Sequence, residues 1–153
     1  MKIKILLGLL VVLVVIQFFR PTRNLGPAEP GPNDITVLYP TPAPVKAILA
    51  KACYDCHSDH TRYPWYANVQ PVAWWLANHI SEGKNHLNFS QFSTYNPKRA
   101  DHKLEAAIRQ VHDDEMPLWT YTSIHRDADL TDAETATLTD WFAGVRQQIA
   151  AKK

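Results

Sequence analysis

The most apolar stretch of the chain lies at its beginning. From Ile5 to Phe19 only Gly8 and Gln17 interrupt a run of apolar residues. This run of 15 residues is at the upper end of a signal-peptide core and below the roughly 20 residues that comfortably span a bilayer. No small-residue cleavage site follows it, which favours an uncleaved anchor over a removed export signal. We therefore expect residues 1–20 to form an N-terminal signal anchor.

Two lysines ahead of the apolar run indicate its orientation. Lys2 and Lys4 precede the run, and basic residues that flank a membrane segment are usually retained in the cytoplasm. The remainder of the chain would then lie on the other side of the membrane. The sequence predicts a single-pass protein of the cell inner membrane, with its folded part facing the periplasm or the exterior.

A proline-rich segment follows the apolar run. Residues 21–44 contain seven of the eleven prolines and show no helical periodicity. Proline favours extended backbone, so such a segment is typical of a stiff spacer. We expect a linker over residues 21–43 and a folded domain over residues 44–153.

Apolar residues of the domain recur at helical spacing in four segments. These segments begin at Pro44, at Pro71, at Asn96-Pro97 and at the capping box Thr131–Glu134. Their apolar stripes are Val45, Ile48, Leu49 and Ala52; Val72, Trp75, Leu76, His79 and Ile80; Leu104, Ala107, Ile108 and Val111; and Leu138, Trp141, Phe142, Val145 and Ile149. Gly83 is the expected end of the second helix, and no segment alternates like a strand. The sequence predicts an all-α domain, a bundle of about four helices.

The charge of the chain excludes one class of partner. The formal net charge is +1, and without Lys2 and Lys4 the chain has 14 basic and 15 acidic residues. Nucleic-acid binding requires a clustered basic surface, so we expect no nucleic-acid partner. The sequence also has no paired carboxylates in an apolar setting and no nucleophile beside a base.

Both cysteines of the chain lie in the motif Cys53-Tyr54-Asp55-Cys56-His57. Cys-x-x-Cys-His is the attachment signature of c-type haem, in which two thiols bond to the porphyrin and the histidine ligates iron. One turn of chain places both sulfurs along one edge of the macrocycle. The two residues between the cysteines are interpreted as spacers without a role of their own.

The motif has three other interpretations. Zinc could be bound by Cys53, Cys56, His57 and His60, although the adjacent Cys56 and His57 hinder tetrahedral closure. A dithiol oxidoreductase has the same cysteine spacing, but a strand rather than a helix should precede its motif. A structural disulfide would close only a two-residue loop, which stabilises little.

Met116 is the only methionine besides the initiator. It lies 59 residues after His57, before Pro117, in a non-helical stretch ahead of the last helix. A thioether there can ligate haem iron from the face opposite the histidine, or it can fill a gap in the core. We expect Met116 to be the second axial ligand. The alternatives for an open distal face are His79, His86, His112 and His125.

Several segments together resemble one family. They are Cys53–Ser58, Tyr63–Tyr66, Pro71-Val72, Asn78-His79, His86–Ser90 and Glu115–Leu118 with Tyr121. Over residues 34–145 the chain is similar to the bacterial haem-binding domain family, whose members look like membrane-tethered, monohaem relatives of cytochrome c. The resemblance implies one covalent haem c at Cys53 and Cys56, with its iron ligated by His57 and Met116. One departure is His125-Arg126, where the family pattern has His-Pro.

Two functions follow from these expectations. The first is a membrane-anchored c-type cytochrome that transfers single electrons at the outer face of the cytoplasmic membrane. Histidine and methionine ligation would fill both axial positions, which favours electron transfer over oxygen chemistry. Its partners would be an envelope redox protein and the cytochrome c maturation machinery that attaches haem. The alternative is a haem-based small-ligand sensor or peroxidase-like enzyme with an open distal site.

Overall fold

The computed structural model of the protein describes residues 2–151. In this range the chain forms eight α-helices and three short 3-10 helices, with no β-strand. Their bounds are α1 Lys2–Ile16, α2 Ile35–Leu38, α3 Ala43–Ala52, α4 Tyr54–His57, η1 Trp65–Asn68, α5 Val72–His86, η2 Phe89–Thr94, α6 Pro97–His112, α7 Trp119–Thr122, η3 Arg126–Ala128 and α8 Asp132–Ala151. The prediction of an all-α fold is confirmed.

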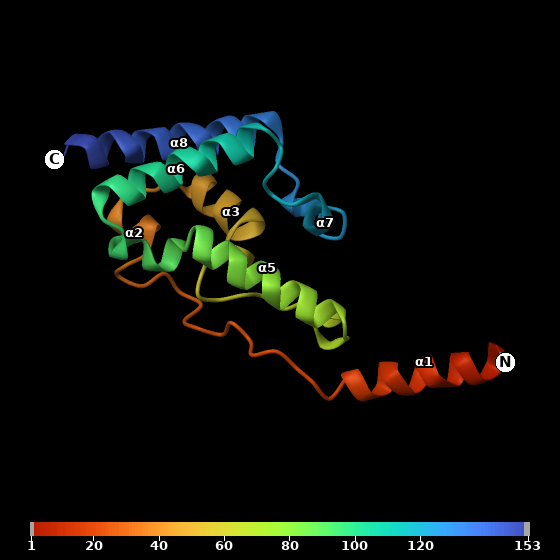
Figure 1. Ribbon diagram of the computed structural model, residues 1–153. Coiled ribbons are helices and arrows are strands. Elements are labelled where there is room, and N and C mark those ends of the chain that lie inside the picture. Colours follow the sequence, from red (N-terminus) through yellow and green to blue (C-terminus); the bar gives the residue numbers. More distant parts are fainter. Residues whose placement is uncertain (1, 152–153) are drawn as a thin grey trace.

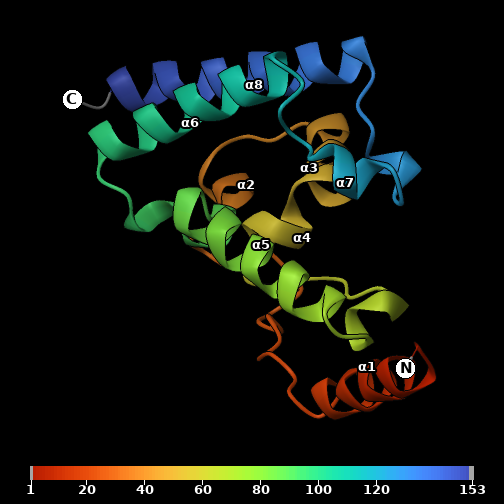
Figure 2. The same ribbon diagram turned by 45° about the vertical axis from the view of Figure 1, so that its right-hand side comes forward.

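The main core lies under two long antiparallel helices. Figures 1 and 2 show α6 and α8 side by side, with α3 and α2 beneath them and α5 on the far side of α4. The fully buried side chains at this contact include Leu104 of α6, Leu138 and Phe142 of α8, and Leu49 of α3. The expected stripes of α3, α6 and α8 supply this core, whereas the stripe of α5 contributes no residue to it.

A second, smaller cluster lies under α5. Ala67 of η1 packs with Leu76 and Ile80 of α5. Val72, Trp75 and His79, which we expected on the apolar face of this helix, lie outside the cluster. The rings of Trp75 and His79 make a tilted contact, with 4.2 Å between their centroids. These side chains lie outside the cluster because α5 packs against α4 through a different face, the one that carries Gly83.

Helix ends follow the expected capping chemistry with one correction. Asn96 Oδ1 accepts a 2.9 Å hydrogen bond from the amide of Arg99, and Thr131 and Glu134 form the reciprocal bonds of a capping box. The second helix, however, continues past Gly83 to His86. Gly83 is an interior residue of α5 and serves a packing contact rather than termination.

The segment expected to be a linker contacts the domain over much of its length. Asn24 bonds through its side chain to the Ser58 carbonyl, at 2.9 Å, and to Thr61 Oγ1, at 3.0 Å. Further along, Asp34 and Ile35 are completely buried. Prolines here shape an extended chain that is packed on the domain, because its polar and apolar side chains find partners there.

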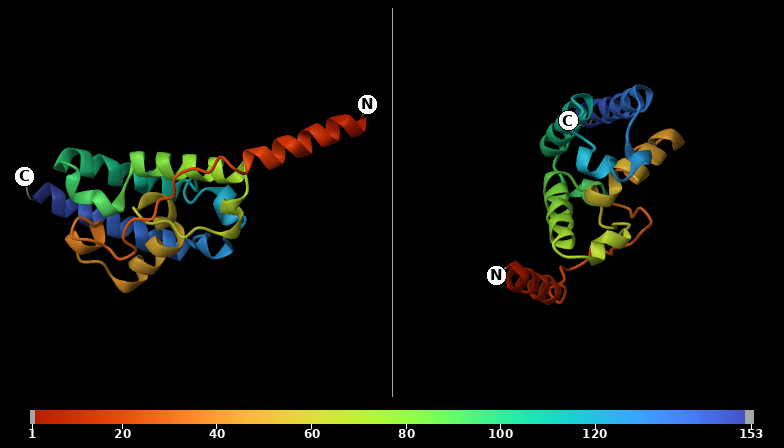
Figure 3. Two further views of the ribbon diagram at one scale, coloured as in Figure 1. Left: turned by 90° about the horizontal axis from the view of Figure 1, so that it is seen from below. Right: turned by 90° about the vertical axis from the view of Figure 1, so that its right-hand side faces the viewer.

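Helix α1 projects from one end of the domain, as Figures 1 and 3 show. None of its side chains is buried. Among residues 2–151, no helix is both long enough and apolar enough to cross a membrane. The base of α1 is fixed by Gln17, whose side-chain amide bonds to both backbone groups of Gln70, at 2.9 and 3.2 Å.

Candidate functional site

The cysteine motif occupies a helical turn of its own. Cys53 ends α3 with φ −125° and ψ −43°, and α4 then begins at Tyr54 in a new direction. The amide of His57 donates to the Cys53 carbonyl at 2.9 Å, which closes this single turn. Figure 2 shows α4 between α3 and α5. The motif thus lies between two helices, and one helical turn separates Cys53 from Cys56.

Cys53 and Cys56 are free thiols that face two different clusters. Cys53 packs against the main core, and Cys56 against the smaller cluster under α5. Burial, with the neighbouring Cys56 as a lesser cause, raises the pKa of Cys53 to about 12. Burial and the charge of Asp55 raise the pKa of Cys56 to about 11. Neither sulfur is activated as a thiolate, which argues against a dithiol oxidoreductase.

His57 is held by a backbone carbonyl. Its Nδ1 lies 2.8 Å from the carbonyl oxygen of Leu87, just beyond the end of α5. Burial is the main cause that lowers the pKa of His57, so the ring is neutral at pH 7. A carbonyl only accepts, so Nδ1 carries the proton and Nε2 keeps its lone pair. This is the tautomer that a metal-ligating histidine needs.

Helix α5 approaches the motif at Gly83. A Cβ built at this position would lie 2.8 Å from the carbonyl oxygen of Cys56. Only glycine permits this approach, and the next turn of α5 brings Leu87 to His57. The residue therefore sets the distance between α5 and α4, a role that its place in the sequence did not indicate.

The two residues between the cysteines are anchors rather than spacers. Tyr54 donates a 2.8 Å hydrogen bond to Asp34, and its ring stacks on Phe89 with 5.6 Å between centroids. Burial is the main cause that raises the pKa of Tyr54. This contact ties the motif to the start of α2, which sequence spacing alone could not suggest.

Asp55 connects the motif to two other segments. Its carboxylate accepts from the backbone and side chain of Arg62 at 3.0–3.1 Å and from the hydroxyl of Tyr121 at 2.7 Å. Tyr121 belongs to α7, 66 positions along the chain. Burial and the bond to Asp55 raise the pKa of Tyr121, so it remains a donor at all ordinary pH values. Asp55 therefore links the cysteine motif to the segment that follows Met116.

Met116 lies in the connection between α6 and α7. It is partly buried and packs against the same core that Cys53 contacts. Its amide donates a 2.9 Å hydrogen bond to the carbonyl of Gln110, at the end of α6. The structure thus brings Met116 and Cys53 to one core.

The alternative distal histidines differ in their surroundings. His86 and His112 are exposed on helix surfaces, and His79 faces Trp75. His125 is the exception, since its Nε2 lies 2.7 Å from the hydroxyl of Tyr66 and its ring stacks on Tyr121 at 4.3 Å. Tyr66 also packs with the cluster that contains Cys56. His125 is thus linked to the motif through ring and hydrogen-bond contacts, and His86 acts on His57 through its charge.

The zinc interpretation finds no support in the geometry. His60 Nδ1 lies 2.7 Å from the carbonyl oxygen of Gly26. Over residues 2–151, no three side chains of His, Cys, Asp or Glu converge in a way that could hold a metal ion. Within these residues the geometry therefore offers no set of four zinc ligands.

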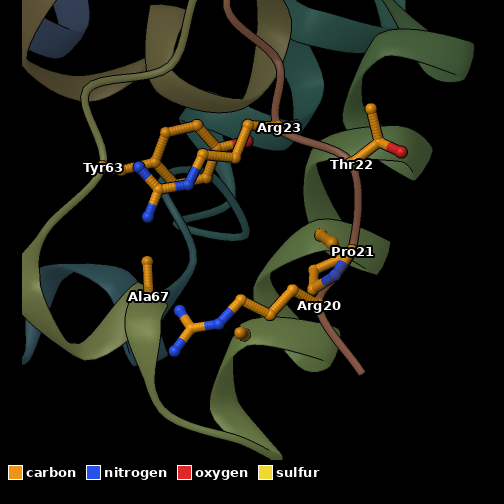
Figure 4. A pocket seen from close by; sticks show the side chains of 8 residues that line it. Arg20, Pro21, Thr22, Arg23, Tyr63 and Ala67 are labelled. Atoms are coloured by element: carbon orange, nitrogen blue, oxygen red, sulfur yellow. The ribbon is translucent and has the colours of Figure 1, made fainter. Parts of the chain in front are cut away.

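Two cavities lie away from the motif, at the base of α1. The larger, of about 300 Å³, is lined by Arg20–Arg23, Tyr63 and alanines of η1 and α5, and Figure 4 shows Arg20 and Arg23 around it. The second, of about 270 Å³, shares Thr22, Arg23 and Tyr63 and extends to Lys84. Neither is lined by the cysteines, His57 or Met116.

Comparison with known families gives one result that covers most of the chain. A family described as haem-binding domain matches residues 11–144. Comparisons with curated proteins and with solved structures give no match. The match covers the motif, the Gly83 contact, the Leu87 carbonyl and Met116. The chain belongs to the haem-binding domain family.

Proposed function

We propose that this protein binds one haem covalently through Cys53 and Cys56 and transfers single electrons. The observation that carries the proposal is the hydrogen bond of His57 Nδ1 to the Leu87 carbonyl, beside two unpaired thiols. It leaves Nε2 as a ligand atom with a fixed ring orientation. Membership of a haem-binding family supplies the cofactor, and the donor set of this turn is chemically suited to a c-type attachment.

The two thiols fit this attachment in position and in protonation. Each thiol would add its S–H across one vinyl group, so that sulfur bonds to carbon and the proton goes to the neighbouring carbon. Burial keeps both sulfurs protonated, and no disulfide ties them together. Because one cysteine faces each cluster, the attached group would be bordered by apolar side chains on both sides.

Met116 is the residue proposed to hold the haem iron together with His57. Its thioether is partly buried on the core that Cys53 also contacts, and the bond between Asp55 and Tyr121 holds the following segment near the motif. A haem with histidine and methionine ligands supplies a one-electron couple of raised potential. His57, Met116 and the surrounding apolar residues would position it and exclude water.

The protein is proposed to be attached to the inner membrane. The apolar surface of α1, of which no residue is buried, and the lysines at its start support residues 1–20 as an anchor in the inner membrane. The domain would then lie at the outer face, where an envelope redox partner meets it and where the maturation machinery attaches haem.

A reduced pyridine spectrum after acid extraction tests covalent attachment. We expect haem to remain with protein produced alongside a cytochrome c maturation system, with both thioether bonds formed. The variant with Cys53→Ser and Cys56→Ser should release its haem into the solvent, whereas Ser58→Ala, next to the motif, should retain it. Haem that leaves the unaltered protein with the solvent would refute the proposal.

A second function is favoured by one observation, the contact of His125 with Tyr66 and Tyr121. A histidine and two phenols linked to the motif could serve a haem with an open distal face, as in a small-ligand sensor or a peroxidase-like enzyme. Carbon monoxide separates the two functions. An electron carrier with Met116 bound should bind it slowly and incompletely, and rapid stoichiometric binding would favour the open site.

A further inference from the structure

Large exposed apolar side chains gather at one end of the domain. Figures 1 and 3 show that α7, η1 and the start of α5 lie at the end from which α1 projects. The exposed residues of these elements and of the base of α1 are Phe18, Phe19, Trp65, Val69, Val72, Trp74, Trp75, Trp119 and Ile124. Trp65 and Trp119 are 79% and 77% exposed, which is unusual for the largest side chain. We call these nine residues the α1-proximal face.

Contacts between the elements make this face a fixed surface. The indole of Trp74 donates a 2.7 Å hydrogen bond to the carbonyl of Phe19. Gln70, which is 2% exposed, also donates to that carbonyl, at 2.9 Å. The bond between Tyr66 and His125 joins η1 to the segment after α7. The face therefore keeps a defined position relative to the base of α1.

Positive charge lines the cavity beneath the same end. Figure 4 shows the side chains of Arg20 and Arg23 directed toward the cavity of about 300 Å³ that Tyr63 and Ala67 also line. The guanidinium of Arg23 lies 5.0 Å from the centre of the Tyr63 ring and 2.5 Å from Asn68 Oδ1. None of the described residues that line this cavity carries a carboxylate. Its chemistry suits an anionic group, and arginine is well matched to phosphate.

We propose that the α1-proximal face rests on the bilayer surface, with its aromatic residues at headgroup level and Arg20 and Arg23 binding phospholipid phosphate. Tryptophan combines an apolar ring with a polar N–H, and it is enriched at this level of membrane proteins. The face is continuous with α1, so a bilayer that takes up α1 reaches these residues without any rearrangement. This inference rests on the proposed membrane attachment and is independent of haem.

The bilayer fits this face better than a protein partner does. A protein partner would have to approach beside α1, in the space that the membrane itself fills once α1 is inserted. The arginines at the base of α1 also lie where lipid phosphates would be. By contrast, the exposed Val37 and Leu38 of α2 lie at the other end of the domain, away from α1.

Hydroxyl-radical labelling of the full chain in phosphatidylglycerol and phosphatidylcholine vesicles tests the proposal. Radicals are generated by radiolysis of water, and oxidation of each tryptophan is measured by mass spectrometry. By exposure alone, Trp65 and Trp119 should be oxidised faster than the partly buried Trp141. We expect this order to reverse in vesicles. Arg20→Gln should partly restore labelling of Trp65, and Lys98→Gln at the far end should not.

Flotation of the same vesicles distinguishes a failure of the docking proposal from a failure of membrane attachment. If the protein floats and Trp65 and Trp119 remain the fastest labelled, the docking proposal is refuted and membrane attachment stands. Protection seen in native membranes but not in pure lipid would assign the face to a protein partner and would also refute it. A chain that does not float contradicts the attachment itself, and with it this inference.

Discussion

The two proposed axial positions are built in different ways. His57 is partly buried, its ring is bonded to a backbone carbonyl at 2.8 Å, and the turn that carries it is packed against α5 through Gly83. Met116 lies in a partly buried connection, and the nearby short helix α7 is tied to the motif by one side-chain bond, from Tyr121 to Asp55.

This difference indicates which side of the site is preformed. Backbone hydrogen bonds and close helix packing fix the histidine side before any cofactor binds. The Met116 amide is bonded to the end of α6, but the segment after it is tied to the motif by a side-chain bond across 66 positions. A hydrogen bond to a charged group contributes about 1.5–3 kcal/mol at most. We therefore expect substitutions on the two sides to have separable effects, on folding in the first case and on ligation in the second.

The largest effect is expected from Gly83→Ala. The added Cβ would meet the Cys56 carbonyl oxygen at 2.8 Å, which forces α5 away from α4. Such overpacking typically costs about 1–3 kcal/mol in the free energy of unfolding, which urea denaturation measures. Gly144→Ala in α8 is the matched control, because its Cβ would meet nothing within 4 Å. That control should be neutral or stabilising by about 0.5–1 kcal/mol.

Tyr121→Phe should affect the methionine side. It removes the hydroxyl that donates to Asp55 and should lower the free energy of unfolding by only about 0.5–1.5 kcal/mol, because Arg62 still binds the carboxylate. In the haem protein the weak sulfur-to-iron band near the red end of the ferric spectrum should diminish. Thr122→Ala, the neighbouring control, should leave that band intact. An unchanged band in Tyr121→Phe would mean that Asp55 does not position Met116.

Acidification should lower the free energy of unfolding of the haem-free protein through the protonation of His57. Burial lowers the pKa of folded His57, so the unfolded chain takes up its proton first as the pH falls. Stability is therefore present above the ordinary histidine pKa of about 6.5 and declines below it, by at most about 1.4 kcal/mol per pH unit. Urea unfolding over the range from neutral to mildly acidic pH measures the slope. His57→Gln should flatten it, and exposed His112→Gln should not.

Met116→Leu should have the smallest effect on folding. Leucine conserves most of the volume in a partly buried position, so the cost should be below about 1.5 kcal/mol. The sulfur-to-iron band should nevertheless disappear and the reduction potential should fall. A variant that keeps both would show that another residue, with His125 as the first candidate, occupies the distal position.

Much of the fold follows from periodicity and caps. The stripes of α3, α6 and α8 and the capping residues Asn96 and Thr131 are local signals, and each is present in the structure. On α5 the same method misplaced Trp75, because two neighbouring faces of that helix are apolar and only tertiary packing selects between them. The prediction that Gly83 ends this helix is wrong for a similar reason, since a packing glycine and a capping glycine cannot be distinguished in one sequence.

The site was predictable only where its signal is local. Cys53, Cys56 and His57 lie within five consecutive residues, and cysteine and histidine at this spacing are the residues that attach and ligate haem. The roles of Tyr54 and Asp55 depend on Asp34 and Tyr121, which are distant in the chain and carry no pattern of their own. The carbonyl of Leu87 is a backbone group, so no residue type could have pointed to it.

The two hydrogen bonds between Gln17 and Gln70 bear on how a membrane-attached form of the protein would encounter its proposed partners. The side-chain amide of Gln17 is bonded to both backbone groups of Gln70. These bonds hold the base of α1 in one orientation relative to the domain. Under the proposed membrane attachment, this joint would restrict the domain from turning toward a partner. Encounters would then depend on lateral diffusion in the plane of the bilayer, and electron transfer would slow as the membrane becomes more viscous.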